Sequence, residues 1–328
     1  MGRFLKVFFI TFFISILLVM VGFYSYLRIF NPLDDLNNIP SIIGEEDDDL
    51  IDDPNATPFD IAKKNSKRIN VLIVGLEHVR TDTIMVASYD RKTKEANIFS
   101  IPRDTLYERP GYKNAGSLKI NAVYQSEDIG GLIDAVQKLM DIPIHRYVTV
   151  DYEAVIKGID VLGGIEMDIP FHMKYTDPSD KPPLRVDIPK GNGILLDGKT
   201  SLGFLRFRKG DPGYEGYPDG DIGRTKAQQR FVKEVVKKLI SLKLPNFINE
   251  VYPYIKTNFS TSELIALASD SIGFSMDNLS TETLPGNEDQ KLKRETGLSF
   301  YALNKEEVVK LVYKMYGVLE EEEASSNE

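Results

Sequence analysis

The chain has 328 residues, 42% of them hydrophobic, with 49 acids against 40 bases and a formal net charge of −9. This length and apolar content are enough to bury one substantial core. Cysteine is absent, which excludes disulfide bonds and thiolate chemistry and is compatible with an exported location.

The first predicted element is an uncharged apolar segment, Val7–Leu27. It is long enough to cross a bilayer of roughly 30 Å as a helix. Arg3 and Lys6 precede it and only Arg28 follows before an acidic stretch, so residues 1–6 are expected in the cytoplasm and the bulk outside. A cleavable signal peptide is the alternative. Because the segment runs into GFYSYLRIF rather than small residues, we expect an uncleaved anchor and a single-pass type II membrane protein.

Acidic segments flank the predicted domain. Residues 28–62 contain ten acids and four prolines, which is typical of a solvated linker, and residues 320–328 form an acidic tail with five acids. The segment 63–319 keeps 37 bases and 34 acids and is therefore slightly basic. The acidity of the whole chain thus says nothing about the ligand, and a basic domain suits an anionic one.

Within 63–319, strand and helix patterns alternate. Short β-favouring runs bounded by turn formers predict strands at RINVLIVGLE, TIMVASYD, EANIFSIPRD, RYVTVD and IEMDIP, with short ones near Thr281 and Ser299. The polar turn Arg91–Glu95 predicts a hairpin between the second and third strands. Apolar residues at helical spacing predict helices at IGGLIDAVQKLM and EAVIKGIDVLGG and over residues 222–240, 262–271 and 305–316. This order indicates a single α/β domain whose sheet is covered by helices on both faces.

Charged residues stand at the ends of the first predicted strands. Glu77, Arg80 and Asp82 lie in the connection between the first and second strands, and Arg103 and Asp104 follow the third. Ligands of α/β sheets bind at strand ends, so these two loops are expected to share one crevice.

The long predicted helix after DGDIG carries a cation at an unusual place. Arg224 lies in its first turn, where the helix dipole disfavours positive charge by about 0.3–1 kcal/mol. Arg224, Gln228 and Phe231 share one narrow stripe next to the core face. This favours an anion bound by Arg224, and an ion pair with Asp219 or Asp221 is an equal alternative.

Two further arginines precede that helix. Arg206 and Arg208 alternate on RFR, which predicts an extended segment with both guanidinium groups on one side, suited to a pyrophosphate. A strand with an exposed charged face is the alternative. The intervening GDPGYEGYPD could form a lid or contact an acceptor, although an ordinary surface loop is the preferred interpretation. No Walker loop, GxGxxG motif or zinc spacing occurs.

Taken in order, a set of motifs in the chain resembles the LytR-CpsA-Psr family of membrane-anchored cell-envelope proteins. The motifs are INVLIVG, RTDTIMVAS, FSIPRDT, KINAVY, GGIEMDIP, LLDG, LRFR and GDIGRTKAQQRF. The resemblance is strong from about Ile69 to Leu239 and continues more weakly through TNFSTSELIALAS and TETLPG. It implies a central mixed sheet flanked by helices on both faces, outside the cell membrane and preceded by the transmembrane helix.

The resemblance also implies an activity. Members of the family move a glycopolymer, such as wall teichoic acid or capsular polysaccharide, from an undecaprenyl pyrophosphate carrier to peptidoglycan. The residues that it implies for gripping pyrophosphate are Arg80, Arg103, Arg206, Arg208, Arg224 and Gln228. Arg103, Arg206 and Arg208 would also act in catalysis with Asp82.

Asp82 matches the family's magnesium-associated acid, and Mg²⁺, or Mn²⁺ in its place, is the cofactor implied. Asp82 could be a metal ligand or the acceptor of the incoming hydroxyl proton. The short loop GLEHVR departs from the family's acid-containing GSDSR-like loop, and Glu77 occupies roughly the place of the second acid. That departure puts a two-acid metal site in doubt.

Two other functions remain open. One is a non-catalytic protein that binds polyprenyl phosphates or regulates wall assembly, and the other is a pyrophosphatase in which water replaces the acceptor. Nucleic acid is not an expected partner, because the domain is only slightly basic and has no helix-turn-helix pattern.

Overall fold

The structure is a computed structural model, and it describes residues 56–77, 80–180, 183–218, 220–241 and 244–318. The expected anchor Val7–Leu27 and the acidic tail lie outside these ranges. None of the helices within them is long and apolar enough to cross a membrane.

The elements alternate as the sequence patterns predict. The strands are β1 (Arg68–Glu77), β2 (Arg80–Asp90), β3 (Glu95–Ile101), β4 (Arg146–Val150), β5 (Ile165–Ile169), β6 (Met173–Asp177), β7 (Leu184–Ile188), β8 (Gly191–Leu196), β9 (Lys256–Thr257), β10 (Leu279–Thr283), β11 (Gly286–Glu288) and β12 (Tyr301–Leu303). The α-helices are α3 (Pro58–Asn65), α4 (Val123–Met140), α5 (Tyr152–Val161), α6 (Gly198–Arg206), α7 (Asp221–Ser241), α8 (Leu244–Val251), α9 (Thr261–Asp270), α10 (Gln290–Thr296) and α11 (Lys305–Met315).

Six strands form the central sheet in the order β10-β3-β2-β1-β4-β9. β1, β2 and β3 form an antiparallel meander, whereas β4 pairs parallel to β1 and β10 parallel to β3. The sheet is therefore mixed, as the resemblance implied. The turn Arg91–Glu95 connects β2 to β3, which confirms the predicted hairpin.

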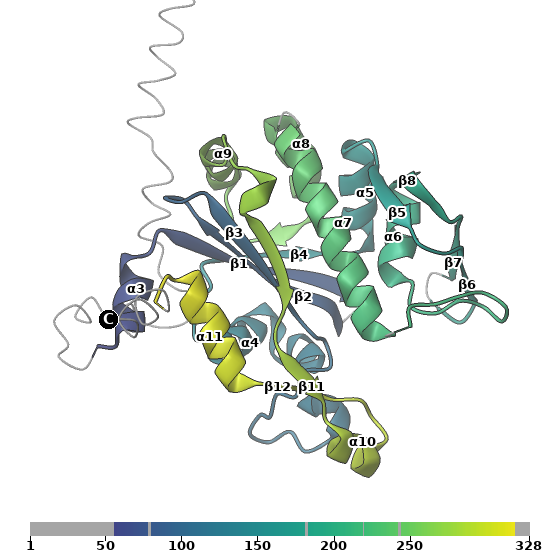
Figure 1. Cartoon of the computed structure of the whole chain (residues 1–328), viewed down its shortest axis with the longest axis horizontal. Coiled ribbons are helices and arrows are strands. Elements are labelled where there is room, and N and C mark those ends of the chain that lie inside the picture. The colour runs from purple at the N-terminus through teal and green to yellow at the C-terminus, as the bar shows by residue number, and fades with distance from the viewer. Residues whose placement is uncertain (1–55, 78–79, 181–182, 219, 242–243, 319–328) are drawn as a thin grey trace, which may run out of the picture.

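Helices cover both faces of this sheet. Alternate side chains of a strand point to opposite faces. On one face Leu72 packs in a core with Leu132 of α4 and Val312 of α11. On the other face Ile69 packs against Ala266 of α9. Figure 1 shows α4 and α11 on one side of the sheet and α9 on the other, which confirms the predicted layers.

The folded domain begins upstream of Lys63. α3 starts at Pro58, within the stretch expected to be a linker, and Thr57 caps it by accepting a hydrogen bond from the Asp60 amide. Phe59 of this helix is 2% exposed, and its ring stacks on Tyr313 at 4.5 Å between centroids. The acidic composition of this stretch predicts a linker and gives no sign that Phe59 is buried in the core.

A second, smaller core lies beside the central sheet. The predicted strand IEMDIP forms β5, but β5 pairs with β8 in a separate two-stranded sheet instead of joining the central one. The hairpin β6–β7 and helices α5 and α6 complete this region (Figure 1). Ala227 and Phe231 of α7 are buried in its core. α7 therefore packs against this second core, which lies outside the central sheet.

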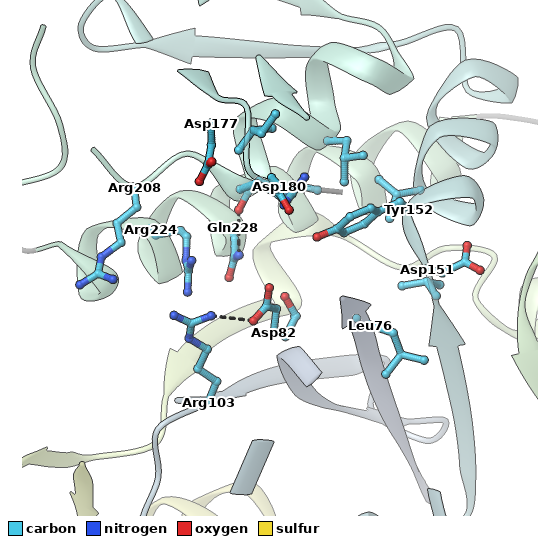
Figure 2. Close-up of a pocket in the computed structure, with 18 of the residues that line it drawn as sticks. Leu76, Asp82, Arg103, Asp151, Tyr152, Asp177, Asp180, Arg208, Arg224 and Gln228 are labelled. Atoms are coloured by element: carbon cyan, nitrogen blue, oxygen red, sulfur yellow. Dashed lines mark hydrogen bonds and ion pairs between the residues drawn. The ribbon is translucent and has the colours of Figure 1, made fainter. Parts of the chain in front are cut away.

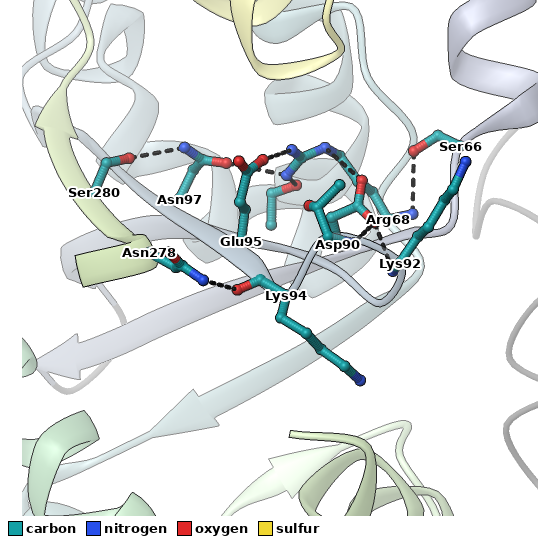
Figure 3. A network of polar contacts seen from close by, with 11 residues as sticks. Ser66, Arg68, Asp90, Lys92, Lys94, Glu95, Asn97, Asn278 and Ser280 are labelled. Carbon is teal, nitrogen blue, oxygen red and sulfur yellow. Dashed lines mark hydrogen bonds and ion pairs between the residues drawn. The ribbon is translucent and has the colours of Figure 1, made fainter. Parts of the chain in front are cut away.

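The end of the sheet where β1 begins holds a structural arginine. Arg68 is 8% exposed, and its guanidinium donates to the Asn97 side-chain oxygen at 3.0 Å and pairs with Asp90 and Glu95 (Figure 3). Asn97 in turn donates to Ser280, which links β3 to β10. The positive charge of Arg68 is therefore balanced by carboxylates of the same sheet.

Candidate active site

Four strands end or begin at the end of the central sheet that lies opposite Arg68. β1 and β4 are parallel and both finish there, and the antiparallel pairing makes β2 begin and β3 finish at the same edge. The structure therefore brings the end of β1 and the start of β2 beside the loop after β3, as expected from the strand ends. Open α/β sheets bind ligands in such positions.

Asp82 is the extra residue of a β-bulge. Gly75 faces Thr83 and Leu76 faces Thr81 in the β1–β2 register, so Asp82 falls between two paired positions. A Cβ atom on Gly75 would lie 3.0 Å from the Thr83 Cβ, so this close approach favours glycine. A bulge bends its strand and re-aims a side chain. This one gives Asp82 its place in the cavity wall.

Arg103 is held in a tight turn after β3. The Thr105 amide donates to the Pro102 carbonyl at 2.9 Å, and the Asn121 amide donates to the Arg103 carbonyl at 3.2 Å. The side chain reaches back so that its Nη1 lies 2.6 Å from Asp82 Oδ1. Both side chains keep about a quarter of their surface exposed, at 23% and 27%.

The prediction that RFR is extended is wrong for its first residue. α6 runs to Arg206, and Phe207 leaves the helix with an extended conformation and is fully buried. Because Phe207 turns inward, Arg206 and Arg208 still both line the same cavity. Arg206 forms an ion pair with Asp180, and its guanidinium lies 4.5 Å from the centre of the Tyr152 ring.

Arg224 and Gln228 lie on the first turns of α7 and are each 9% exposed. Gln228 Nε2 donates to the Leu205 carbonyl at 3.0 Å, which ties α7 to α6. Asp219 and the side chain of Asp221 lie outside the described part of the chain. The alternative of an ion pair with either acid therefore stays a prediction.

The neighbouring Gln229 holds α7 on the central sheet. Its Nε2 donates to Ser100 Oγ of β3 at 3.1 Å and to Thr283 Oγ1 of β10 at 3.0 Å. Gln229 is 9% exposed and Ser100 3% exposed, so these hydrogen bonds are made away from water. They fix where Arg224 and Gln228 stand relative to the sheet edge.

The loop before α7 has one buried anchor. Tyr217 packs edge-on against Phe171 and Phe207, with ring centroids 5.4 and 5.9 Å away. Burial raises the pKa of the Tyr217 phenol to about 12. Gly223 lies close to this ring, since a Cβ there would fall 2.5 Å from the Tyr217 Cβ. The loop is thus packed to the smaller core through Tyr217, while residues 212–215 are exposed, as expected of a surface loop.

Two cavities open at this edge. The first cavity has a volume of about 340 Å³ and the second of about 460 Å³. The residues that line both are Asp82, Thr83, Arg103, Arg208, Arg224 and Gln228. Figure 2 shows Arg103 and Arg224 reaching toward one another from opposite walls, with Asp82 beside them. Guanidinium groups brought this close favour an anion between them.

Most of the predicted site residues meet here. Those that line the first cavity are Asp82, Arg103, Arg206, Arg208, Arg224 and Gln228. Arg80 is different, because it is exposed at the start of β2 and belongs to the lining of neither of these two cavities. Glu77 ends β1 opposite Arg80 in the register, and its side chain lies outside the described part.

Sequence reasoning missed several polar residues of the cavity wall, among them Asp177, Asp180 and Tyr152. Asp177 ends β6, Asp180 follows it toward β7, and Tyr152 opens α5. Figure 2 shows Asp180 and Tyr152 across the cavity from Asp82. The acids in YTDPSD were the available signal, but they read equally well as a polar turn between strands.

The donor set suits a magnesium ion that also binds phosphate. Among the described residues no group of three or more acids and histidines is arranged to hold a metal by itself. Mg²⁺ keeps several waters and takes one or two carboxylates together with substrate phosphates. The Asp82 carboxylate in an arginine-lined cavity meets that requirement.

An α/β fold that brings arginines from separate elements together beside Asp82 defines a domain suited to binding phosphate groups. The sequence model of the LytR_cpsA_psr family matches residues 41–316, and the chain belongs to this family. The family resemblance inferred from the sequence motifs is therefore confirmed.

Individual proteins of known sequence and structure are also similar to this chain. The chain is 27% identical over 240 residues to the polyisoprenyl-teichoic acid–peptidoglycan teichoic acid transferase TagV of Bacillus subtilis (strain 168), covering 70% of this chain and 59% of TagV. It is 31% identical over 213 residues to the regulatory protein MsrR of Staphylococcus aureus (strain COL), covering 61% and 59%. The match thus spans about 59% of the length of both. The crystal structure of B. subtilis TagV superposes with a TM-score of 0.61 at 25% identity, over 76% of this chain and 97% of that one.

Proposed function

We propose that the chain is a phosphotransferase that moves a glycopolymer, such as wall teichoic acid or a related polysaccharide, from an undecaprenyl pyrophosphate carrier to peptidoglycan. The observation that carries this proposal is the meeting of Arg103, Arg206, Arg208 and Arg224 at one cavity beside Asp82. Guanidinium forks match phosphate oxygens with paired hydrogen bonds. The name of the B. subtilis relative supports the choice of polymer and acceptor.

The residues of the cavity can perform the reaction by charge stabilisation and alignment. A hydroxyl oxygen of the acceptor bonds to the phosphorus that carries the polymer, and the bond from that phosphorus to the bridging oxygen breaks. The products are a phosphodiester and undecaprenyl phosphate. Such transfers need little covalent chemistry from the protein, and positive groups that face the developing charge supply most of the stabilisation.

Asp82 is the proposed acceptor of the hydroxyl proton. It is the one carboxylate among the described residues that lines both cavities, so it can face the attacking oxygen and the phosphate together. Asp82 would also hold Mg²⁺, or Mn²⁺, whose charge offsets that of the pyrophosphate oxygens when the ion is bound.

We place this domain outside the cytoplasmic membrane, anchored by Val7–Leu27. The apolar length and the flanking bases of that segment support the placement. An outer position also suits the proposed acceptor, since peptidoglycan lies on that side of the membrane.

One experiment separates transfer from the alternatives of hydrolysis and binding alone. The full chain in detergent is incubated with Mg²⁺, a short polyprenyl-pyrophosphate-linked saccharide and a peptidoglycan fragment. Mass spectrometry should then find the saccharide joined to the fragment through phosphate. Release of saccharide phosphate with no joined product would indicate a pyrophosphatase. Binding of the lipid with neither product would indicate the regulatory role that the name of MsrR suggests.

A further inference from the structure

The second cavity lies against the first with a shared charged wall. The shared residues named above supply three guanidinium groups, and Asp82 is their carboxylate. A phosphorus atom held by these groups would border both cavities. The two cavities therefore lie on the two sides of one set of residues that can bind phosphate.

The stereochemistry of phosphoryl transfer requires two compartments. The attacking and leaving oxygens lie roughly in line on opposite sides of the phosphorus. The leaving oxygen belongs to the lipid phosphate, so the acceptor hydroxyl has to approach from the other side. A carrier in one cavity thus places the acceptor in the other.

The first cavity combines charged groups with an aliphatic surface. Beyond the shared wall, the aliphatic residues Leu76, Val150, Val155, Leu184, Leu202 and Leu205 line it together with charged and polar ones, among them Asp151, Tyr152, Asp177, Asp180 and Lys209. Arg206 lines only this cavity of the two and adds positive charge beside that aliphatic surface. Aliphatic side chains next to arginines fit a prenyl chain joined to a pyrophosphate.

The second cavity presents hydrogen-bonding groups at its outer wall. Its floor is made by buried apolar residues of β2 and β3, and apolar atoms make up most of its surface, while polar side chains line its outer part. These are Thr225, Lys226, Asn287, Glu288, Ser299 and Tyr301. Hydroxyl, amide and carboxylate groups around an apolar floor suit a sugar with hydroxyl and acetamido substituents.

The polar wall is fixed in place. Glu288 Oε1 accepts hydrogen bonds from Lys293 and Ser299, both at 2.7 Å, and its Oε2 accepts one from Gln290 at 2.9 Å. The hydrogen bond from Lys293 lowers the pKa of the Glu288 carboxyl below its usual value. This carboxylate is therefore held as an acceptor for a ligand hydroxyl.

The same wall is tied to the Arg103 turn. The Tyr301 amide donates to the Asp104 carbonyl at 2.9 Å, and the Leu106 amide donates to the Tyr301 carbonyl at 2.9 Å. β12 carries Tyr301 and pairs with β11, which carries Asn287 and Glu288. A sugar held by these two paired strands would consequently keep a fixed distance from Arg103 and Asp82.

We propose that the second cavity is the acceptor site, in which Asn287 and Glu288 bind a sugar of the peptidoglycan glycan chain and present its hydroxyl to the phosphorus. This rests on the proposed function. The hydroxyl oxygen bonds to the polymer-bearing phosphorus, its proton passes to Asp82, and undecaprenyl phosphate departs into the first cavity.

The test measures two ligands on the full chain in detergent. The probes are geranyl pyrophosphate, with Mg²⁺, for the first cavity and a peptidoglycan tetrasaccharide for the second, both by calorimetry. Asn287→Ala and Glu288→Gln should each weaken tetrasaccharide binding about tenfold, the effect of a lost hydrogen bond to a charged or buried group. Geranyl pyrophosphate binding should stay within twofold. Leu202→Asn should give the reverse pattern.

Lys291→Ala is the matched control, because Lys291 is exposed on α10 and does not line the second cavity. Asn287 is exposed, so its variant should keep the wild-type melting temperature even if Glu288→Gln loosens α10. Weaker geranyl pyrophosphate binding in the Asn287 and Glu288 variants, or tetrasaccharide binding that is absent in the wild type, would overturn the proposal. Normal binding of both ligands without transfer would instead count against the proposed function alone.

Discussion

Arg103 Nη1 lies 2.6 Å from Asp82 Oδ1, because the start of β2 and the end of β3 meet at the open end of the β2–β3 hairpin. The pair stands in the wall that both cavities share. Because each side chain orients the other, we expect them to act in catalysis as a unit.

Asp82→Asn and Arg103→Ala should each lower kcat/KM for transfer by roughly 10²–10³-fold, the cost of removing one group that stabilises a transition state. The double variant should lose little more than either single variant, because residues that act together are not additive. Steady-state transfer rates measure this. Asp168→Asn on β5 is the control, since it lies outside both cavities. Losses that multiply in the double variant would show that the two residues act independently.

Arg206→Ala and Arg208→Ala should abolish most transfer, by roughly 10²–10³-fold, with the fold intact. Lysine at either position should restore charge but only part of the rate, since it cannot form paired hydrogen bonds with phosphate. Rates and thermal melts are measured together, and Arg185→Ala, exposed on β7, is the control. Unchanged turnover in both alanine variants would remove the arginine-clamp mechanism.

Asp180→Asn should strengthen binding of a pyrophosphate lipid. Asp180 pairs with Arg206 where the oxygens of a bound pyrophosphate would lie, so pyrophosphate binding has to displace the Asp180 carboxylate. A partly exposed ion pair contributes about 0.2–1 kcal/mol, so the Kd should fall by roughly 1.5- to 5-fold. Calorimetry with geranyl pyrophosphate measures this, with Asp187→Asn on β7 as the control. Weaker binding would mean that Asp180 contacts the ligand or its ion directly.

Removal of divalent ions should stop transfer. The cavity wall carries Asp82, Asp151, Asp177 and Asp180, but among the described residues no three acids or histidines are grouped to hold a metal, so the affinity for an ion without substrate should be low. Treatment with EDTA should abolish the reaction, and Mg²⁺ or Mn²⁺ should restore it. The melting temperature should not change, which distinguishes a catalytic ion from a structural one. Full activity in EDTA would contradict the proposed requirement.

His145 should make stability fall on acidification. Burial, together with nearby Arg146, lowers its pKa to about 4, and its Nδ1 accepts a hydrogen bond from the Asn70 amide at 3.0 Å. The folded state keeps it neutral while the unfolded state takes up a proton below about pH 6.5. Stability from this group is thus present above that pH and is lost between about 6.5 and 4, on the order of 2–4 kcal/mol in all.

Urea unfolding at pH 7, 5.5 and 4.5 tests this contribution. His145→Gln should flatten the dependence of the free energy of unfolding on pH relative to the wild type. The comparison between variants separates His145 from carboxyl groups whose pKa values are also lowered, such as Asp60 and Glu263. An identical slope in His145→Gln and wild type would contradict the prediction.

The sequence by itself determined many of the elements and most members of the site. Short β-favouring runs bounded by turn formers define β1 to β4, and helical spacing defines α4, α5 and α7, because these patterns are local. The arginines and Asp82 could be named because they stand at element ends or in ordered motifs. Local patterns could not reveal that Arg206 ends a helix, since the turn depends on Phe207 finding its place in a core built by distant residues.

Tertiary structure decided how these residues meet. Asp82 enters the cavity wall because a bulge opposite Gly75 and Leu76 shifts the β1–β2 register, and pairing between strands is not written in either strand alone. Asp180 reaches Arg206 across 26 positions of sequence, and Tyr301 is bonded to the Arg103 turn from nearly 200 residues away. The sequence therefore names the groups that bind phosphate, while long-range packing divides the space around them into two compartments.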